Sequence, residues 1–168
     1  MEQEGVGVDK EYAETMARRG DLRMKSIYRE LGFNPSSPKQ LGKVLIEGLG
    51  LPVVAHTASC PECKRKRPVT SHTWNASFNK KAMEFYDDIL MASNNTSARR
   101  IAEYRGWQKA VSSLYLPMLE KEGPDGRIRT EFKQHGTVTG RLSASNPNLQ
   151  QIPRSSSNVW NGNAKSAF

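Results

Sequence analysis

The sequence predicts an α+β fold that is mainly helical: long antiparallel helices with a helix-loop tip, then a short β-hairpin and an irregular segment. Apolar residues recur at helical spacing through most of residues 9–122. Apolar and polar residues alternate at 128–132, and turn-forming residues dominate after 140. A chain of 168 residues makes one domain with a modest core the default expectation.

The first predicted helix spans residues 9–31. Asp9 can cap its N-terminus and Gly32 can end it. Gly20 is a weak point in the middle, because glycine has a low helix propensity. The apolar residues at roughly helical spacing are Tyr12, Met16, Ile27 and Leu31.

A second helix is predicted to begin at Ser37, where serine at the N-cap and Pro38 at the first helical position form a typical start. Gly50 follows its last apolar residue and ends it. Its apolar face consists of Leu41, Val44, Leu45 and Leu49. Residues 53–76 lack helical periodicity and are expected to form a loop.

Two more helices are predicted after this loop. One spans about 79–91, and the longest spans about 98–122 and is capped by Thr96 or Ser97. Pro117 should bend the last turns of the longest helix. Apolar residues recur along it at three- and four-residue steps: Ile101, Tyr104, Trp107, Val111, Leu114 and Met118. The stripe formed by Tyr104, Trp107 and Met118 is most simply core.

Alternation at 128–132 predicts a strand, and a short partner strand is expected near 136–139. The chain beyond this hairpin is expected to be irregular. The hairpin would therefore lead into a segment that meets another layer of structure.

The charge of the chain points to a polyanionic partner. Its net charge is +8 and its pI is about 9.7. From residue 127 to residue 168 there are six Lys or Arg and one acid, so 6 − 1 gives +5 for the last quarter. More than half of the net charge therefore lies there.

Apolar runs are too short to predict a membrane span, and the N-terminus opens with acids rather than a signal peptide. We therefore expect a soluble, cytoplasmic protein without a membrane partner. Two cysteines three positions apart are not expected to form a disulfide in a reducing cytosol.

The most informative segment, residues 137–154, is polar, turn-rich and free of acids. It offers the guanidinium groups of Arg141 and Arg154, together with side-chain amides from Asn146, Asn148, Gln150 and Gln151. Such groups bond phosphate oxygens and the acceptors of a duplex minor groove. The segment therefore predicts a nucleic-acid contact rather than a core.

This segment closely resembles the T-x-T-G-R-L-S-S-S-x-P-N-L-Q-N-I-P signature of family A DNA polymerases, the bacterial polymerase I and phage replicative group. Three other stretches resemble family elements in the family order. Residues 1–9 resemble M-E-x-x-G-V-x-V-D, and residues 33–45 resemble F-N-x-x-S-P-K-Q-L-x-x-V-L. Residues 125–130 resemble the D-G-R-I-H-T hairpin that precedes the signature.

The resemblance implies that residues 1–122 form the thumb, with a basic, cysteine-containing tip loop at 53–76. Residues 123–168 would form the start of the palm. The family's metal-binding strands follow the signature, so the chain is expected to stop before them and to be inactive alone. The rest of the palm and the fingers would then be a partner fragment.

Nucleotidyl transfer needs carboxylates that hold a pair of Mg²⁺ ions. None of the chain's aspartates suits this role, because Asp9 and Asp125 are placed for a helix cap and a turn, and Asp21 for the middle of a helix. Asp87 and Asp88 are neighbours on a helix and point in different directions. Magnesium is therefore expected only in the complete polymerase.

By resemblance, Arg141 enters the minor groove of the primer–template, where arginine donates to acceptors that every base pair presents. Its structural alternative is a pair with Glu131, the only acid from residue 127 onward. Gln150 and Gln151 would contact the groove or sugars, although the family commonly has Asn at the second position. Asn148 would contact DNA or satisfy the backbone of its turn. Thr139 and Arg154 complete this DNA-binding set.

The resemblance also places a group of predicted thumb-tip residues on the duplex backbone: Ser36, Ser37, Lys39, Gln40 and Lys43. Hydroxyls, amides and helix N-termini suit phosphate. The alternative is a well-capped, solvated helix, which explains the serine and proline at its start fully and the lysines adequately.

The tip loop contains Cys60 and Cys63, flanked by His56 and His72 in the pattern H-x3-C-x2-C-x8-H. This pattern makes a candidate tetrahedral zinc site, with reduced thiols in an exposed loop as the alternative. Four adjacent positive charges follow the cysteines and are expected to track phosphates: Lys64, Arg65, Lys66 and Arg67.

The sequence therefore predicts the primer–template-binding portion of a phage-like, DNA-directed DNA polymerase that acts in replication in a bacterial host. Two alternatives remain open. One is a self-standing nucleic-acid-binding or regulatory module, and the other is a zinc-ribbon-like adaptor in which the cysteine loop is primary.

Overall fold

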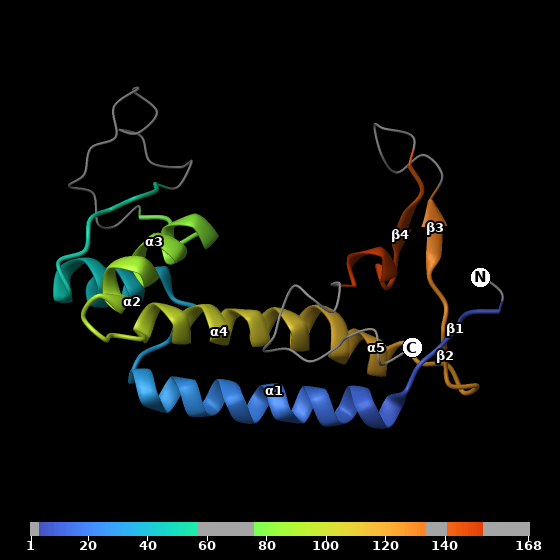
Figure 1. Ribbon diagram of the computed structural model, residues 1–168. Coiled ribbons are helices and arrows are strands. Elements are labelled where there is room, and N and C mark those ends of the chain that lie inside the picture. Colours follow the sequence, from blue (N-terminus) through green and yellow to red (C-terminus); the bar gives the residue numbers. More distant parts are fainter. Residues whose placement is uncertain (1–3, 57–75, 134–140, 153–168) are drawn as a thin grey trace. The chain divides into compact units, whose positions relative to one another are not determined.

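The computed structural model describes residues 4–56, 76–133 and 141–152 (Figure 1). It is mainly helical with two small antiparallel sheets of two strands each, which confirms the predicted fold class. The chain divides into two compact units. The first contains Met1–Met24 and Gly106–Phe168, and the second contains Lys25–Arg105. Among the described residues, no helix has the length and apolar character needed to cross a membrane.

Helix α1 (Lys10–Leu31) has the predicted extent. The Asp9 carboxylate accepts a hydrogen bond of 2.9 Å from the Tyr12 backbone N–H, so Asp9 caps the helix as predicted. At the other end, Gly32 has a φ of 72°, and its N–H donates to the carbonyl of Tyr28 at 3.0 Å. A glycine adopts this left-handed conformation without a Cβ clash and therefore ends the helix.

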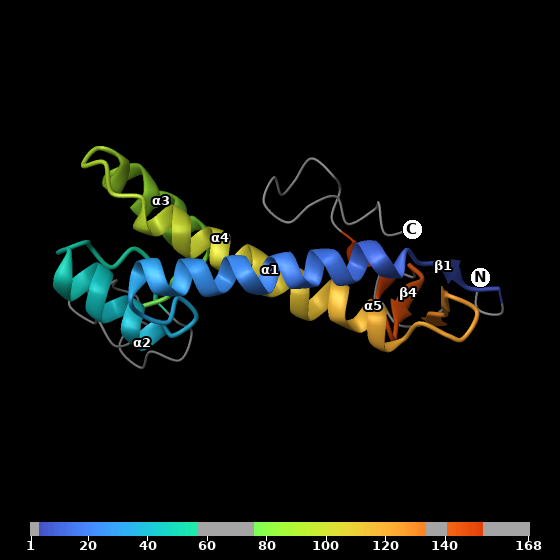
Figure 2. The same ribbon diagram turned by 90° about the horizontal axis from the view of Figure 1, so that it is seen from below.

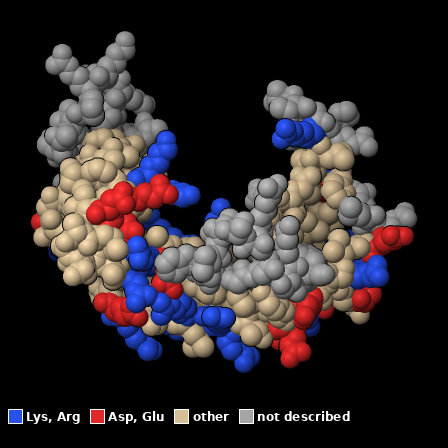
Figure 3. All heavy atoms as spheres, viewed as in Figure 1, with Lys and Arg blue, Asp and Glu red and all other residues tan. Residues whose placement is uncertain are grey.

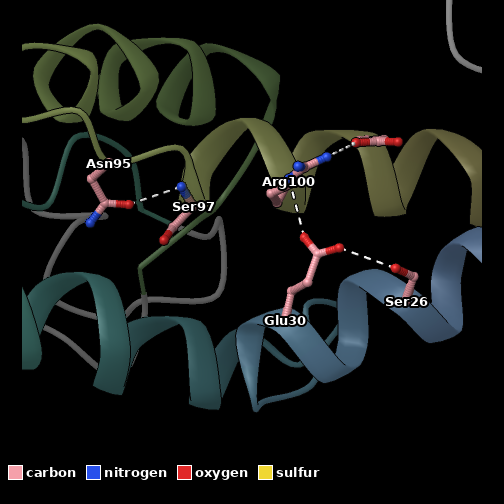
Figure 4. Close-up of polar contacts among 6 residues, drawn as sticks. Ser26, Glu30, Asn95, Ser97 and Arg100 are labelled. Carbon is pink, nitrogen blue, oxygen red and sulfur yellow. Dashed lines mark hydrogen bonds and ion pairs between the residues drawn. The ribbon is translucent and has the colours of Figure 1, made fainter.

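The predicted long helix is one helical run in three parts: α4 (Ser97–Ala110), the π-helical segment η4 (Val111–Tyr115) and α5 (Leu116–Glu120). The wider π turn comes just before Pro117, whose nitrogen has no hydrogen to donate to the preceding turn. Thr96, one of the two predicted caps, occupies the N-cap position of this run, because its carbonyl accepts from the Arg100 N–H at 3.0 Å. Asn95 also contributes to the helix start, since its Oδ1 accepts from the Ser97 N–H at 2.9 Å (Figure 4).

In the first unit, the N-terminal half of α1 runs antiparallel to residues 106–120 (Figures 1 and 2). Gly20 lies where the two helices approach each other closely. A Cβ built on Gly20 would lie 2.5 Å from Val111 Cγ2 and 2.9 Å from Trp107 Cε3. The buried residues of this core are Ala13, Met16, Trp107, Ala110 and Tyr115.

The second unit places α2 (Pro38–Leu41), the π-helical segment η1 (Gly42–Gly48) and α3 (Lys80–Met91) around a second core. Leu41 and Leu45 are fully buried there, whereas Leu49 at the end of the predicted apolar face is 42% exposed. The helix ends before Leu49, so that side chain does not follow the buried face. Other core residues are Val53, Phe78, Met83, Tyr86, Leu90 and Ile101.

Ionic contacts join α1 to α4 within the second unit (Figure 4). Arg100 Nε lies 3.3 Å from the Glu30 carboxylate, and Arg100 Nη1 donates to Glu103 at 3.1 Å. Ser26 also donates to Glu30, at 3.1 Å. Glu103 is only 5% exposed, so Arg100 supplies the counter-charge that a buried carboxylate requires.

The strands differ from the sequence prediction. The single strand predicted at 128–132 is in fact two strands in different sheets. β2 (Arg127–Ile128) pairs with β1 (Val6–Gly7), and β3 (Glu131–Lys133) pairs with β4 (Ser143–Ser145). The partner predicted near 136–139 lies outside the described residues. The expectation of irregular structure after the hairpin is wrong at β4, because strand pairing there overrides the low β-propensity of a serine-rich sequence.

Candidate nucleic-acid interface

The described part of the segment that resembles the polymerase signature, residues 141–152, includes the second strand of the β3–β4 hairpin. In this hairpin Glu131 pairs with Ser145 and Lys133 with Ser143. Arg141 lies two residues before the first residue of β4. Arg141 is exposed, and the neighbouring Leu142 is 54% exposed. In the space-filling view, basic side chains lie at this end of the hairpin (Figure 3). The hairpin therefore presents Arg141 to the surroundings.

A buried threonine fixes the turn that follows β4. Thr130 lies between β2 and β3 and is 4% exposed. Its hydroxyl lies 3.0 Å from the carbonyl of Ser145 and 2.6 Å from that of Pro147, so one O–H is shared between two acceptors. The buried Thr130 side chain therefore holds the turn through two of its backbone carbonyls.

Asn146 holds the same turn from its outer side. Its φ of 59° is in the left-handed region, which asparagine tolerates better than most residues. Its Oδ1 accepts from the Lys121 ammonium, and its Nδ2 lies 3.5 Å from the Glu131 carboxylate. Glu131, which the sequence offered as the structural partner of Arg141, thus has Asn146 as a neighbour.

The 3-10 turn η5 (Leu149–Gln151) carries the predicted amides. Asn148 Oδ1 accepts from the backbone N–H of Gln150 at 3.1 Å, so Asn148 satisfies its own turn, the structural option that the sequence left open. The Gln150 amide donates to the carbonyl of Leu142 at 3.1 Å and accepts from the N–H of Ala144 at 3.3 Å. Ile152 then packs against the buried pair Met118 and Ile128.

The turn before β2 is closed by an exposed ion pair. Arg129 contacts the Asp125 carboxylate through two nitrogens, at 2.6 and 3.1 Å. The hydrogen bond from Arg129 lowers the pKa of Asp125 to about 2, and the same contact raises the pKa of Arg129. Asp125 is thus engaged in shaping this turn.

The thumb-tip candidates lie in the second unit and divide into two kinds. Ser37 Oγ accepts from the Gln40 N–H at 3.4 Å, and Gln40 Oε1 accepts from the Asn34 N–H at 2.6 Å, so both side chains contribute to the helix start. Lys39 and Lys43 are exposed and four residues apart, on one helical face. Ser36, partly buried, donates its backbone N–H to Asn34 Oδ1 at 2.9 Å.

Of the candidate zinc ligands, only His56 is among the described residues, where it bridges to Ala76. Cys60, Cys63, His72 and the basic run 64–67 lie outside them, as do Thr139 and Arg154, and the side chain of Gln151 is not described. Within residues 4–56, 76–133 and 141–152, no group of three His, Cys, Asp or Glu side chains is placed to hold a metal ion.

Sequence reasoning missed two residues that shape the interface, Thr130 and Lys121. Thr130 had a usable signal, because it ends the D-G-R-I-R-T stretch and shares the face of Ile128 and Phe132 in the alternating pattern. Lys121 had none: its partner Asn146 is 25 residues away in sequence.

Comparison with known proteins identifies the family. The family described as "DNA polymerase family A" matches residues 8–168. The chain is 32% identical over 159 residues to DNA polymerase I of Helicobacter pylori, and 34% identical over 161 residues to that of Synechocystis sp.. Each match covers 91% of this chain but only 15% and 14% of the relative. The chain thus spans about 15% of the length of such relatives.

A solved structure shares the fold. It is described as the POL domain of Pol1 from M. smegmatis in complex with DNA primer-template and dNTP. The similarity has a TM-score of 0.75 at 24% sequence identity, and it covers 98% of this chain and 26% of that chain. Together with the family match over nearly the whole sequence, this shows that the chain belongs to DNA polymerase family A.

Proposed function

We propose that this chain provides the part of a DNA-directed DNA polymerase that grips the primer–template during replication. Residues 1–122 would act as the thumb and residues 123–168 as the start of the palm. The observation that carries the proposal is the exposure of Arg141 beside β4 and the turn that follows it. Buried Thr130 and exposed Lys121 hold that turn in place.

Arg141 suits a minor-groove contact for chemical reasons. A guanidinium offers several N–H donors, and the minor groove presents acceptors at purine N3 and pyrimidine O2 in every base pair. A contact of this kind senses groove width rather than sequence. It therefore fits a protein that must hold any primer–template.

Phosphate contacts would supply most of the affinity. Exposed Lys39 and Lys43 lie on one face of the α2–η1 helix, and the run 64–67 adds four charges. Contacts of this kind position a duplex without reading its sequence. The protein of similar fold is itself described as bound to DNA primer-template, which supports a DNA partner for this chain.

We propose that the carboxylates that bind the catalytic metal ions lie outside the described part of this chain. Family A polymerases use Mg²⁺, and two-metal transfer needs acidic ligands that converge on one point. Asp9 caps α1, Asp87 lies 3.5 Å from Arg99, and Asp125 contacts Arg129. We therefore propose that carboxylates outside residues 4–56, 76–133 and 141–152 supply the metal site of the polymerase.

The proposal is tested by the affinity of the full 168-residue chain for a primer–template duplex, measured by fluorescence anisotropy. Arg141→Ala should weaken binding by at least about 10-fold, since charge-assisted hydrogen bonds are worth about 1.5–3 kcal/mol and 1.4 kcal/mol is about tenfold in affinity. Arg18→Ala, which removes the same charge from an exposed site on α1, is the matched control. Equal effects of the two variants would remove Arg141 from the interface.

A further inference from the structure

We propose that Gln150 is a positioning residue for Arg141: its side-chain amide caps the outer edge of β4 and holds the strand that presents the arginine. The inference rests on the proposed function, since it takes Arg141 as the DNA contact. It assigns Gln150 a role different from the direct groove or sugar contact that the family resemblance implies.

The two bonds of the amide reproduce the pattern of a neighbouring strand. Gln150 Nε2 donates to the carbonyl of Leu142 at 3.1 Å, and its Oε1 accepts from the N–H of Ala144 at 3.3 Å. Residues two apart in a strand turn their backbone groups to the same edge. One primary amide therefore satisfies a donor and an acceptor that an added strand would otherwise pair.

The edge in question is the one that faces away from β3. Ala144 is opposite Phe132 in the register, and its N–H is bonded to Gln150. Ala144 is therefore a non-hydrogen-bonded partner of Phe132, with its backbone groups directed outward. An isolated two-stranded sheet is only marginally stable, so a cap on this edge adds order where the hairpin most needs it.

Gln150 is itself held in place. Asn148 Oδ1 accepts from its backbone N–H, and the Thr130 hydroxyl holds the carbonyls of Ser145 and Pro147 in the turn just before it. The glutamine therefore approaches β4 from a fixed turn.

Leu142, whose carbonyl is one of the two capped groups, is the residue next to Arg141 in the chain. Loss of the cap would release the backbone at residue 142 and broaden the positions that the guanidinium samples. Two groups bonded to backbone also leave the Gln150 amide less capacity for base edges, because one donor hydrogen and one lone pair are already engaged.

The first measurement needs no DNA: amide hydrogen exchange of Ala144 in the full chain, followed by NMR. Gln150→Met keeps the length of the side chain and removes both bonds, so exchange should accelerate about 5- to 10-fold. Gln150→Glu keeps an acceptor for Ala144 and loses the donor to Leu142, so protection of Ala144 should largely persist. Gln108→Met, the same change at an exposed site on α4, should leave Ala144 unchanged.

The second measurement is a double-mutant cycle in primer–template affinity. Gln150→Met should weaken binding about threefold when Arg141 is present and should have no further effect in the Arg141→Ala background. A direct contact would instead cost the same factor in both backgrounds. Additive losses, or no loss in either background, would overturn the positioning role.

The two measurements separate the possible failures. If the unsubstituted chain does not bind primer–template DNA, the proposed function fails and the link from Gln150 to binding fails with it. If DNA binds normally but Ala144 exchange is the same in Gln150→Met, the edge cap is refuted while the proposed function stands.

Discussion

Replacing Gly20 with alanine tests a close helix–helix approach in the first unit. Glycine is a poor helix former, and at an exposed mid-helix site the change would stabilise the protein by about 1 kcal/mol. At Gly20 the new methyl would lie 2.5 Å from Val111 Cγ2 and 2.9 Å from Trp107 Cε3. The propensity gain and the steric cost therefore have opposite signs.

The distances decide which effect is larger. Carbon atoms in good contact lie about 3.5–4.0 Å apart, so the Val111 methyl would have to move by about 1 Å. Neither neighbour yields easily, because valine is stiff at χ1 and Trp107 is 2% exposed in a packed core. Overpacking of this kind costs about 1–3 kcal/mol. Two short contacts arise together at Gly20, so we expect the upper part of this range, about 2–3 kcal/mol, which less the propensity gain of about 1 kcal/mol lowers the free energy of unfolding by about 1–2 kcal/mol.

Urea unfolding followed by circular dichroism measures this change. With a slope of about 2 kcal/mol per molar urea, the middle of the range usual for small proteins, the midpoint should fall by roughly 0.5–1 M. Gly48→Ala is the matched control: the nearest atom to its Cβ is the Lys43 carbonyl oxygen at 3.4 Å, so stability should be retained or slightly raised. A Gly20→Ala protein as stable as the original would refute the close-packing argument.

Three further outcomes are expected. Arg100→Ala should destabilise the protein by about 1–2 kcal/mol in the same urea assay, because the buried Glu103 carboxylate loses its counter-charge. The loss stays below that of a fully buried ion pair because the Arg100 side chain is 35% exposed, and an effect below about 0.5 kcal/mol would contradict this. The lowered pKa of Asp125 means that its ion pair with Arg129 stabilises the fold above about pH 4 and is lost as the pH falls towards 2; an NMR titration should give a midpoint near 2, which Arg129→Ala returns to the ordinary range. For a zinc site in the tip loop, native mass spectrometry should find one zinc ion per chain, and Cys60→Ser should abolish zinc binding. Protein that is purified without chelator and contains no zinc would show that the two thiols are not zinc ligands.

The helices could be predicted from sequence because their signals are local. The cap at Asp9, the terminator at Gly32 and the 3.6-residue periodicity all act within a few positions, and α1 begins and ends within one residue of its prediction. Gly20 looked like a weak point because propensity is local too. The structure shows why a glycine is needed at this position: Trp107 and Val111, nearly a hundred positions away in sequence, leave no room for a Cβ.

The strands could not be predicted as well because their pairing is tertiary. The alternation at 128–132 was real, but Ile128 pairs with Val6 while Phe132 pairs with Ala144, so one pattern serves two sheets. β4 has only a small alanine facing inward and carries no β-forming pattern of its own. Its register comes from β3 and from the amide of Gln150.

The sequence indicates which segment carries the candidate DNA-contacting residues, but it does not indicate which of their side chains bond to the chain's own backbone. The signature pointed to Arg141 and the amides that follow it. Which side chains reach outward and which hold the backbone depends on distances that no spacing rule gives. The amide of Gln150 and the carboxamide of Asn148 are bonded to backbone groups of their own segment.

The salt dependence of primer–template affinity is the sharpest test of whether this chain grips DNA. Each phosphate contact releases condensed counterions, so the logarithm of the association constant should fall linearly with the logarithm of salt concentration, by about 0.9 per contact. We predict a slope steeper than about −2 for the 168-residue chain, with duplexes of unrelated sequence bound equally well. A flat salt response, or a strong preference for one sequence, would contradict a DNA-gripping role.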